Sequence, residues 1–388
     1  MTSADTPGPG KNVAILRKAR DMSQAKLARE AGVSVSLLSK IEVGDRALNQ
    51  GVAAALARAM GVGLNELLGQ TRIQEDNDEL LKQLRSTIRR FDLPGEPPNN
   101  PEILKSDLVE LTRLRSDAKL REVLEKTPGL LAKATNFAHA NGSPEAWAMV
   151  ADIYSTIYWL AARHRWMDLA DLAVLKQHAA AERANPLLKI VAARDEAGAF
   201  LNSGDFAGGL AIIERAVVQA EKLNGRDRAL GLGLLHLRGL TLAGRAGDKK
   251  ETERHIAAAW RVAEEFSEDV DVHGIHFGPE NTAIHQIATT VDLEQHRTAL
   301  DTMESLTRRP LTLPATRIGP LHMNVARAKL ALGNRDDALE SLVSAWEVAP
   351  QMSKVHPTSR ELMRVLISLH KRSNPTLTKL AQRAGVTI

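Results

Sequence analysis

The stretch SQAKLAREAGVSVSLLSKIEVG, residues 23–44, decides how the N-terminal part of this chain folds. Ser23 and Ser34 each precede a short apolar-periodic run, where a side-chain oxygen can cap a helix by accepting a bond from an early backbone N–H. Gly32 stands between the runs and Gly44 after the second, where the backbone needs a positive φ to turn. The sequence therefore predicts two short helices joined by a tight turn, over residues 24–31 and about 35–43.

Further helices are predicted on both sides of this stretch. Leu27, Val33, Leu38 and Ile41 recur at spacings that let them face one small core, and Ala28 is small where two helices must cross closely. Gly61 ends one flanking segment in the same way as Gly44. We expect the flanking helices at about 12–20, 50–59 and 64–68, which makes a five-helix unit.

This unit resembles the helix-turn-helix domain of the phage-repressor-like (XRE) family throughout residues 15–68. The matching residues are Arg17, Ser23, Gln24, Leu27, Ala28, Ala31, Gly32, Val33, Ser34, Ser39, Ile41, Glu42 and Gly44. The resemblance implies a five-helix lambda-repressor-like fold. In that family the third helix enters the major groove of DNA with its N-terminal residues on base edges.

The resemblance also assigns roles to individual side chains. Val35, Ser36 and Lys40 are the base-facing candidates, because Val35 can touch a thymine methyl group and Lys40 can reach guanine O6 and N7. Gln24 resembles the family's phosphate-contacting glutamine. Further phosphate contacts are expected from Ser34, Ser39, Arg46 and Asn49. A structural ion pair between two helices is expected from Arg17 and Glu42.

The charge of the chain is concentrated at this end. Residues 11–70 hold nine lysines and arginines against five acidic residues, an excess of four that equals the net charge of the whole chain, +4. A local positive excess is what a phosphate backbone would attract. A basic, solvated surface without a partner is the alternative that charge alone leaves open.

The composition excludes several classes of protein. The 388 residues are 44% hydrophobic and 25% charged, which is typical of a soluble globular protein. The chain has no cysteine, hence no disulfide, no thiolate zinc site and no cysteine nucleophile. It also has no apolar stretch long enough to span a membrane. Residues 1–10 lack the apolar core of a secretory signal. We therefore expect a flexible tail there and a cytoplasmic protein.

A linker is predicted between the two main parts of the chain, at residues 71–100, after a DNA-binding domain at 11–70. It ends in DLPGEPPNNP, residues 92–101, a strong helix breaker. Before the breaker an apolar stripe falls on one helix face, formed by Leu81, Leu84, Ile88 and Phe91. The stripe either pairs two copies of the chain or packs on its own chain. We prefer a homodimer, because two-fold pairing doubles the DNA contacts.

The remaining residues, 101–388, contain helix after helix and no convincing alternating strand pattern, so we predict an all-α protein. Similar junctions recur at 203–206, 246–249, 293–296 and 332–335. They resemble a tetratricopeptide (TPR) array with repeats longer than the standard 34 residues. Such helix pairs stack into an α-solenoid. The pairs are expected at 145–163 with 166–183, 186–202 with 206–223, 228–244 with 249–266, 279–293 with 296–308, 316–332 with 336–348, and 357–371 with 375–384.

The first helices of the pairs should line a concave groove that suits an extended peptide. Side-chain amides and charged groups at the expected groove positions are the ligand candidates, with aromatic contacts from Tyr154, Tyr158 and Trp159. For each candidate a structural or solvated role is the alternative. The ligand candidates are Asn202, Arg238, Glu280, Asn281, His285, Arg317, Asn324 and Arg327, with Arg194 and His236 beside them.

Taken together, the two parts resemble the peptide-sensing helix-turn-helix/TPR regulators of Gram-positive bacteria. The segment FGPENTAIH, residues 277–285, is similar to one in actinobacterial regulators of this build. The resemblance implies a transcription regulator of the quorum-sensing type, in which a short peptide bound by the array alters binding to a DNA operator. The alternative is an interaction adaptor whose array docks a folded protein partner, with DNA binding secondary.

Motifs of enzymes are absent from the sequence. It has no P-loop, no dinucleotide fingerprint on a strand, no HExxH and no GxSxG. His273, His276 and His285 invite a metal interpretation, but no regular helix aims the first two at one point. We therefore expect no enzymatic activity, no cofactor and no metal site.

Overall fold

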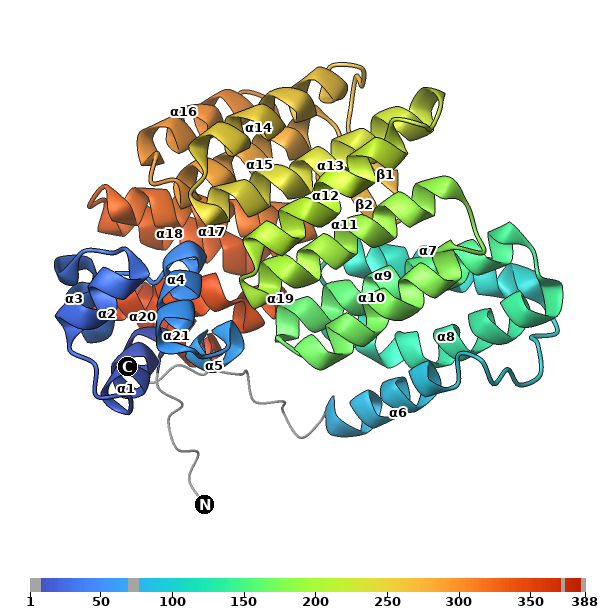
Figure 1. Ribbon diagram of the computed structural model, residues 1–388, viewed down its shortest axis with the longest axis horizontal. Helices are drawn as coiled ribbons and strands as arrows, with labels where there is room; N and C mark the ends of the chain where they lie inside the picture. The colour runs from blue at the N-terminus through green and yellow to red at the C-terminus, as the bar shows by residue number, and fades with distance from the viewer. Residues whose placement is uncertain (1–7, 69–76, 371–373, 385–388) are drawn as a thin grey trace.

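A computed structural model describes residues 8–68, 77–370 and 374–384 of the chain (Figure 1). Over these ranges the protein is built from 21 helices and one two-stranded hairpin, which confirms the all-α prediction. Within the same ranges, no helix has both the length and the hydropathy that a membrane crossing requires.

The first five helices form the unit expected around residues 23–44. Ser23 accepts a bond from Lys26 N, and Ser34 accepts one from Leu37 N, so both act as helix caps. Gly32 and Gly44 have φ of 67° and 94°, the left-handed region that glycine enters without strain. These helices are α1(Pro9–Lys18), α2(Gln24–Ala31), α3(Val35–Val43), α4(Gln50–Met60) and α5(Leu64–Leu68).

Helix α1 starts earlier than predicted. The sequence indicated a tail over 1–10 and a helix from about 12, whereas the helix begins at Pro9. Proline is well placed at a helix start, since its missing N–H would have no partner there and its φ is already helical. The predicted tail residues 1–7 lie outside the described residues.

The apolar stripe of the linker packs on its own chain, so the preferred role in pairing two copies is corrected. Helix α6(Asp78–Arg89) carries Leu84 and Ile88, both fully buried, and lies against α8(Leu120–Asn141) and α10(Met167–Ala181). Phe91 follows it and contacts the rings of Trp147 and Tyr154. A stripe already covered in this way is not free to form a dimer. The linker's residues 71–76 lie outside the described part.

The C-terminal part is a TPR-like array of antiparallel helix pairs, as the repeated junctions predicted. Helices α7(Pro101–Ser116) and α8 precede the array, and the short α19(Pro350–Val355), which the sequence did not suggest, interrupts it near its end. Residue 371, predicted as the end of a helix, lies outside the described residues. The pairs are α9(Pro144–His164) with α10, α11(Pro186–Ser203) with α12(Phe206–Ala220), α13(Gly225–Ala246) with α14(Lys249–Ala263), α15(Pro279–Asp292) with α16(His296–Leu306), α17(Ala315–Ala331) with α18(Arg335–Val348), and α20(Pro357–Leu369) with α21(Pro375–Ala384).

One hairpin interrupts the helices. Strands β1(Val270–Val272) and β2(Ile275–Phe277) pair antiparallel, with Val270 opposite Phe277. Strands of three residues are too short to show an alternating pattern, which is why the sequence analysis missed them. The Phe277 ring is fully buried against α13, where a Cβ on Gly233 would lie 2.2 Å from it. Glycine in this helix is therefore a packing requirement.

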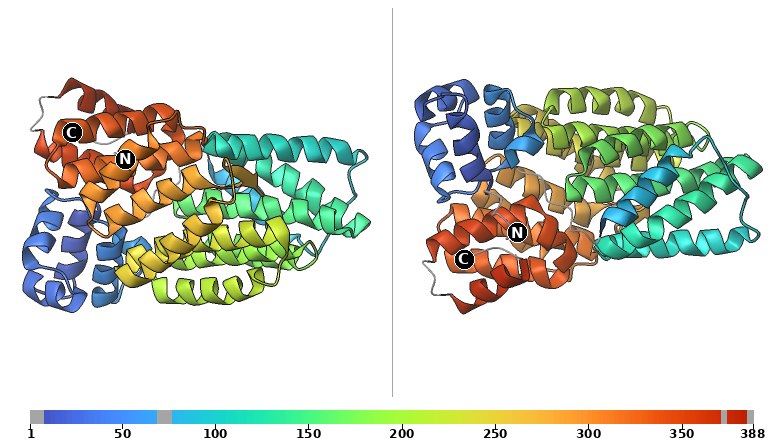
Figure 2. Two further views of the ribbon diagram at one scale, coloured as in Figure 1. Left: turned by 90° about the horizontal axis from the view of Figure 1, so that it is seen from above. Right: turned by 90° about the horizontal axis from the view of Figure 1, so that it is seen from below.

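The five-helix domain is packed onto one end of the array, beside the C-terminal helices (Figure 2). Its apolar core continues into α11, α12 and α13, so that Leu56 and Leu67 share one cluster with Leu201 and Phe206. A Cβ on Gly51 of α4 would lie 2.7 Å from the backbone oxygen of Arg245. Backbone approach this close fixes the position of α4 against α13.

Candidate nucleic-acid interface and ligand cavity

The N-terminal turn of α3 faces solvent. Val35 is 46% exposed, and Ser36 and Lys40 are exposed as well. On the opposite face, Leu38 and Ile41 are buried in the core of the domain. In Figure 1, α3 lies at the outer edge of the molecule; Lys40, in its last turns, also lines a hollow between this domain and the array. The three base-facing candidates are therefore accessible on one edge of a helix that is held rigidly from behind.

A buried ion pair ties the first three helices together. Arg17 Nε lies 2.6 Å from Glu42 Oε1 and Arg17 Nη2 lies 2.7 Å from Glu42 Oε2, while Nη1 donates to the Met22 carbonyl. Gln24 Nε2 also donates to Glu42 Oε2, at 2.8 Å. Burial acts to raise the pKa of Glu42, but the bonds from Arg17 and Gln24 outweigh it and lower that pKa. Gln24, expected on a phosphate, has a partner inside the domain.

The remaining predicted phosphate contacts divide into two groups. Ser34 is the exposed cap of α3, and Ser39 is half-buried on the same helix. Asn49 caps α4 by accepting from Val52 N at 2.7 Å, and Arg46 Nη2 lies 3.4 Å from Glu294 Oε1 of the array. With Lys40 at its rim, a hollow of about 210 Å³ separates this segment from α15, α17 and α20. Arg46 and Asn49 thus face the array in this arrangement.

The inner helices of the array enclose a second cavity, of about 220 Å³. Residues of α7, α9, α11, α13, α15 and α17 line the cavity. Residues of α4 and of the α19–α20 junction close it. Four of the predicted ligand residues lie here, namely Asn202, Arg238, His285 and Arg317. The predicted aromatic residues Tyr158 and Trp159 also line it. The other lining residues include Gln50, Arg115, Arg163, Arg165, Arg194, Asp195, Arg245 and His356. We call this space the arginine cavity.

The other four predicted ligand residues do not line the arginine cavity. Glu280 accepts bonds from the backbone of Thr312 and Leu313. Asn281 donates to the His276 carbonyl at 2.6 Å. These residues hold loops and turns because they sit at or near helix ends. The other two residues lie on α17. Asn324 Nδ2 donates to the Pro320 carbonyl of the same helix at 3.0 Å, and Arg327 Nη2 donates to Asp292 Oδ1 of α15 at 2.8 Å.

The single carboxylate of the cavity lining is already saturated. Asp195 is fully buried and its Oδ1 accepts from Arg194 Nη1 at 2.6 Å. Its Oδ2 accepts from Ser155 Oγ at 2.8 Å and from Gln177 Nε2 at 3.2 Å. The sequence analysis did not propose Asp195, because a lone acidic residue in a helix gives no signal of burial.

The cavity reaches the helix-turn-helix unit through Arg245. Its guanidinium donates to Gln50 Oε1 of α4 and to Asp292 Oδ2 of α15. Asp292 is almost fully buried and also bonds Arg327. Burial acts to raise the pKa of Asp292, but Arg245 and Arg327 lower it. Arg245 therefore links the ligand cavity, the inner helices and the N-terminal domain in one network.

The three histidines considered as metal ligands have separate partners. His273 Nδ1 lies 2.9 Å from Asp152, His276 Nε2 lies 3.6 Å from Asp271, and His285 Nδ1 lies 3.3 Å from Thr241 Oγ1. Although burial acts to lower the pKa of His273, its bond to Asp152 outweighs this and raises it. The three rings are not assembled into one site.

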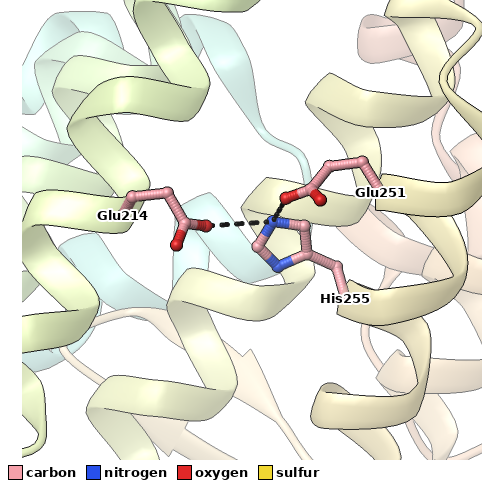
Figure 3. A group of neighbouring side chains, drawn as sticks. All are labelled: Glu214, Glu251 and His255. Carbon is pink, nitrogen blue, oxygen red and sulfur yellow. Dashed lines mark ion pairs between the residues drawn. The ribbon is translucent and has the colours of Figure 1, made fainter.

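A different cluster has the spacing of metal ligands (Figure 3). His255 Nε2 lies 3.3 Å from Glu251 Oε1 and 3.6 Å from Glu214 Oε1. The i, i+4 spacing of Glu251 and His255 was the signal in the sequence. Arg254 Nη2 donates to both carboxylates and lies 3.1 Å from His255 Nε2. The arginine thus already places a positive charge at the centre of the cluster.

Residues 13–67 match the family model described as Helix-turn-helix, which confirms that prediction for the N-terminal domain. A comparison with curated proteins found no match. Among solved structures, the chain is similar to Bacillus thuringiensis PlcR in complex with the peptide PapR7 and DNA, at 12% identity and a TM-score of 0.35, over 88% of this chain and 94% of that one. It is also similar to a PrgX/iCF10 complex, at 11% identity and a TM-score of 0.27, over 95% and 98% of the chains, and to PrgX, at 12% and 0.23, over 93% and 99%.

Proposed function

We propose that this protein is a cytoplasmic transcription regulator that binds a DNA operator through α3 and senses a small ligand, in the first instance a short peptide, in the arginine cavity. The observation that carries the proposal is the position of Gln50. This residue belongs to the helix-turn-helix domain, lines the cavity of the array and bonds Arg245. Whatever enters the cavity meets a side chain of the DNA-binding domain.

The DNA-binding half of the proposal is supported by the exposed edge of α3. Val35 can contact a thymine methyl group, and Lys40 can donate to guanine. The N-terminal turn of α3 is exposed, and α3 lies at the outer edge of the molecule (Figure 1). Two copies of this edge on one operator would lie about 34–36 Å apart, one turn of the duplex. We therefore propose a homodimer on DNA, with the dimer surface outside the α6 stripe.

The sensing half follows from the lining of the cavity. Side-chain amides and guanidinium groups, such as those of Asn202 and Arg238, recognise the backbone and the carboxylate of a peptide. A ligand shifts an equilibrium only by its differential affinity for the two states. Here the two states would be the docked arrangement of α4 on α13 and one in which the Gln50–Arg245 bond is altered. Coupling of this kind typically amounts to about 1–3 kcal/mol.

The DNA-binding proposal is tested with duplexes recovered by a genome-wide pull-down with the full chain. Fluorescence anisotropy should give tight binding that weakens steeply as salt rises, because the contacts release counterions. Lys40→Ala should weaken binding at least tenfold, whereas Arg89→Ala, an exposed change on α6, should not alter it. Binding of no duplex, together with capture of one folded protein partner, would favour the adaptor alternative.

The sensing proposal has a separate test. Synthetic peptides encoded by small open reading frames next to the gene are added to the protein–operator complex. A change in operator affinity supports a peptide ligand. If no such peptide changes it, while the operator still binds, the peptide assignment is wrong and the DNA-binding assignment stands.

A further inference from the structure

The arginine cavity holds far more positive than negative charge. Seven arginines line it against a single carboxylate, that of Asp195. Asp195 is committed to Arg194, Ser155 and Gln177, as described above. The charge of Arg245 is met by Asp292, which lies behind the lining. These two acidic residues therefore serve two of the seven guanidinium groups.

Of the five other guanidinium groups, Arg115 lies within hydrogen-bond distance of the hydroxyl groups of Ser155 and Thr156, and three more concern the proposal. In the described part of the chain, no carboxylate pairs with Arg163, Arg238 or Arg317, and the Nε atom of each is buried with no hydrogen-bond partner. Arg163 rests on the Trp159 ring at 4.5 Å and donates to the Trp159 carbonyl, neither of which neutralises its charge. The three side chains come from α9, α13 and α17 and meet in one space.

The surroundings of these groups disfavour their charge. Burial, and after it the nearby Arg194, Arg115 and Arg238, lowers the pKa of Arg317 to about 9. Burial, followed by repulsion from neighbouring arginines, also lowers the pKa of Arg163 and of Arg238. A fold gains nothing from burying cations together without counter-charge. Groups with strongly perturbed pKa values that gather in one cavity are candidates for a functional site.

We propose that the arginine cavity binds a small ligand that carries at least two anionic groups, phosphates or carboxylates, placed between Arg163, Arg238 and Arg317. The proposal deepens the proposed function and rests on it only for the effect on DNA. A guanidinium group presents its N–H donors as a planar fork that fits phosphate and carboxylate oxygens. A single carboxylate, such as the C-terminus of a neutral peptide, would leave most of the excess charge unpaired.

Neighbouring groups add neutral donors to this site. Burial, followed by repulsion from Arg317, Arg194 and Arg238, lowers the pKa of His285 well below its usual range, so its ring is neutral and can donate or accept. Tyr158 Oη packs over Gly198, where a Cβ would lie 2.0 Å away, and faces Asn202 Nδ2 at 3.5 Å. The cavity thus combines charge for the anionic groups with polar contacts for the rest of a small molecule.

The ligand chemistry is tested by calorimetry and thermal unfolding of the full-length protein at constant ionic strength. The probes are inorganic pyrophosphate, the tripeptide Glu-Glu-Glu, and acetate. We expect saturable 1:1 binding and a raised Tm with at least one of the first two, and neither effect with acetate. Pyrophosphate alone would point to a phosphorylated ligand, and the tripeptide alone to an acidic peptide. Binding of neither overturns the proposal.

Substitutions locate the site. Arg317→Gln and Arg163→Gln should each weaken binding of the effective probe at least tenfold, and Arg89→Gln should leave it unchanged. Without ligand, Arg317→Gln should have a Tm equal to or above that of the wild type, because it relieves repulsion among buried cations. Unchanged binding in both cavity variants would place the anion elsewhere and overturn the assignment. All of these readouts omit DNA, so failure of the regulator proposal would not affect them.

Discussion

Gln50 and Arg245 are 195 positions apart in the chain and hydrogen-bond to each other at the wall of the arginine cavity. One belongs to the helix-turn-helix domain and the other to the central helix of the array. Arg245 also pairs with Asp292 of α15, so its guanidinium group is anchored within the array. This bond is the most direct route by which cavity occupancy can reach α3.

Removing this bond should separate sensing from DNA binding. In Gln50→Ala, operator affinity without ligand should change less than threefold, because α4 lies on the array and not on the proposed DNA edge. The ligand-induced change in operator affinity should shrink at least fivefold. Anisotropy titrations with and without ligand measure both quantities. An undiminished ligand effect would show that the signal travels by another route.

The Arg17–Glu42 pair should be essential to the N-terminal domain. Arg17→Ala leaves the buried carboxylate of Glu42 without its cationic partner, and removing one partner of a buried pair typically costs about 3–5 kcal/mol. We expect loss of operator binding together with a lower Tm or an early unfolding transition in calorimetry. Arg29→Ala, at an exposed position on α2, is the matched control and should leave the Tm unchanged. Equal stability of the two variants would contradict this role.

Acid should destabilise the array through buried neutral histidines. Burial, and after it the charge of Arg254, lowers the pKa of His255 to about 4 from 6.5. At pH values between these two pKa values, His255 is protonated in the unfolded chain but neutral in the folded chain. The free energy of unfolding therefore falls as the pH falls from about 6.5 toward 4. At pH 5 the loss from His255 is about 2 kcal/mol.

Denaturant unfolding at pH 7 and pH 5 measures this loss. His255→Gln lowers stability at pH 7, since it removes ring contacts with Gly239, but the difference between the two pH values should be smaller by about 2 kcal/mol. His236 and other buried histidines keep part of the pH dependence in the variant. A pH dependence identical to that of the wild type would mean that His255 is charged in the folded state.

The contact between Phe277 and α13 predicts opposite outcomes for two glycine substitutions. In Gly233→Ala the new methyl group would meet the Phe277 ring, and overpacking of this kind typically costs about 1–3 kcal/mol. Gly129→Ala on α8 has nothing within 4 Å of the new Cβ and should raise stability by up to about 1 kcal/mol, since alanine is the better helix former. Thermal unfolding of both variants checks the pair. Equal effects would mean that the hairpin is not held against α13.

The sequence predicted the helix ends well where a cap marks them. Ser23 and Ser34 cap α2 and α3, and Gly32 and Gly44 follow their last residues, all local signals that burial does not alter. It could not predict which face of a helix covers another. The stripe around Leu84 therefore suggested a dimer, although α8 and α10 of the same chain cover it.

The arginine cavity was only partly predictable for the same reason. Asn202 and Arg238 were selected because amides and charges on inner helices suit a ligand. Arg163 was missed, because a basic residue in the last turn of a helix is normally solvated there and also suits the helix dipole. Only the stacking of α9, α13 and α17 shows that these side chains converge. Similarly, Glu280 has a charged side chain of the kind that binds ligands. However, it lies at the start of α15, where its carboxylate accepts a bond from the backbone N–H of Thr312.

The shared apolar cluster of α4, α5, α11 and α12 limits how this protein could diversify. Where a DNA-binding domain and a sensor domain are joined only by a flexible linker, recombination can exchange one DNA-binding domain for another. Here the two parts are in close contact, since a Cβ added to Gly204 would lie 3.1 Å from Ala54 Cβ of the helix-turn-helix domain. A DNA-binding domain from another protein would therefore need a surface that fits this array. The two parts should be inherited as one unit and change together.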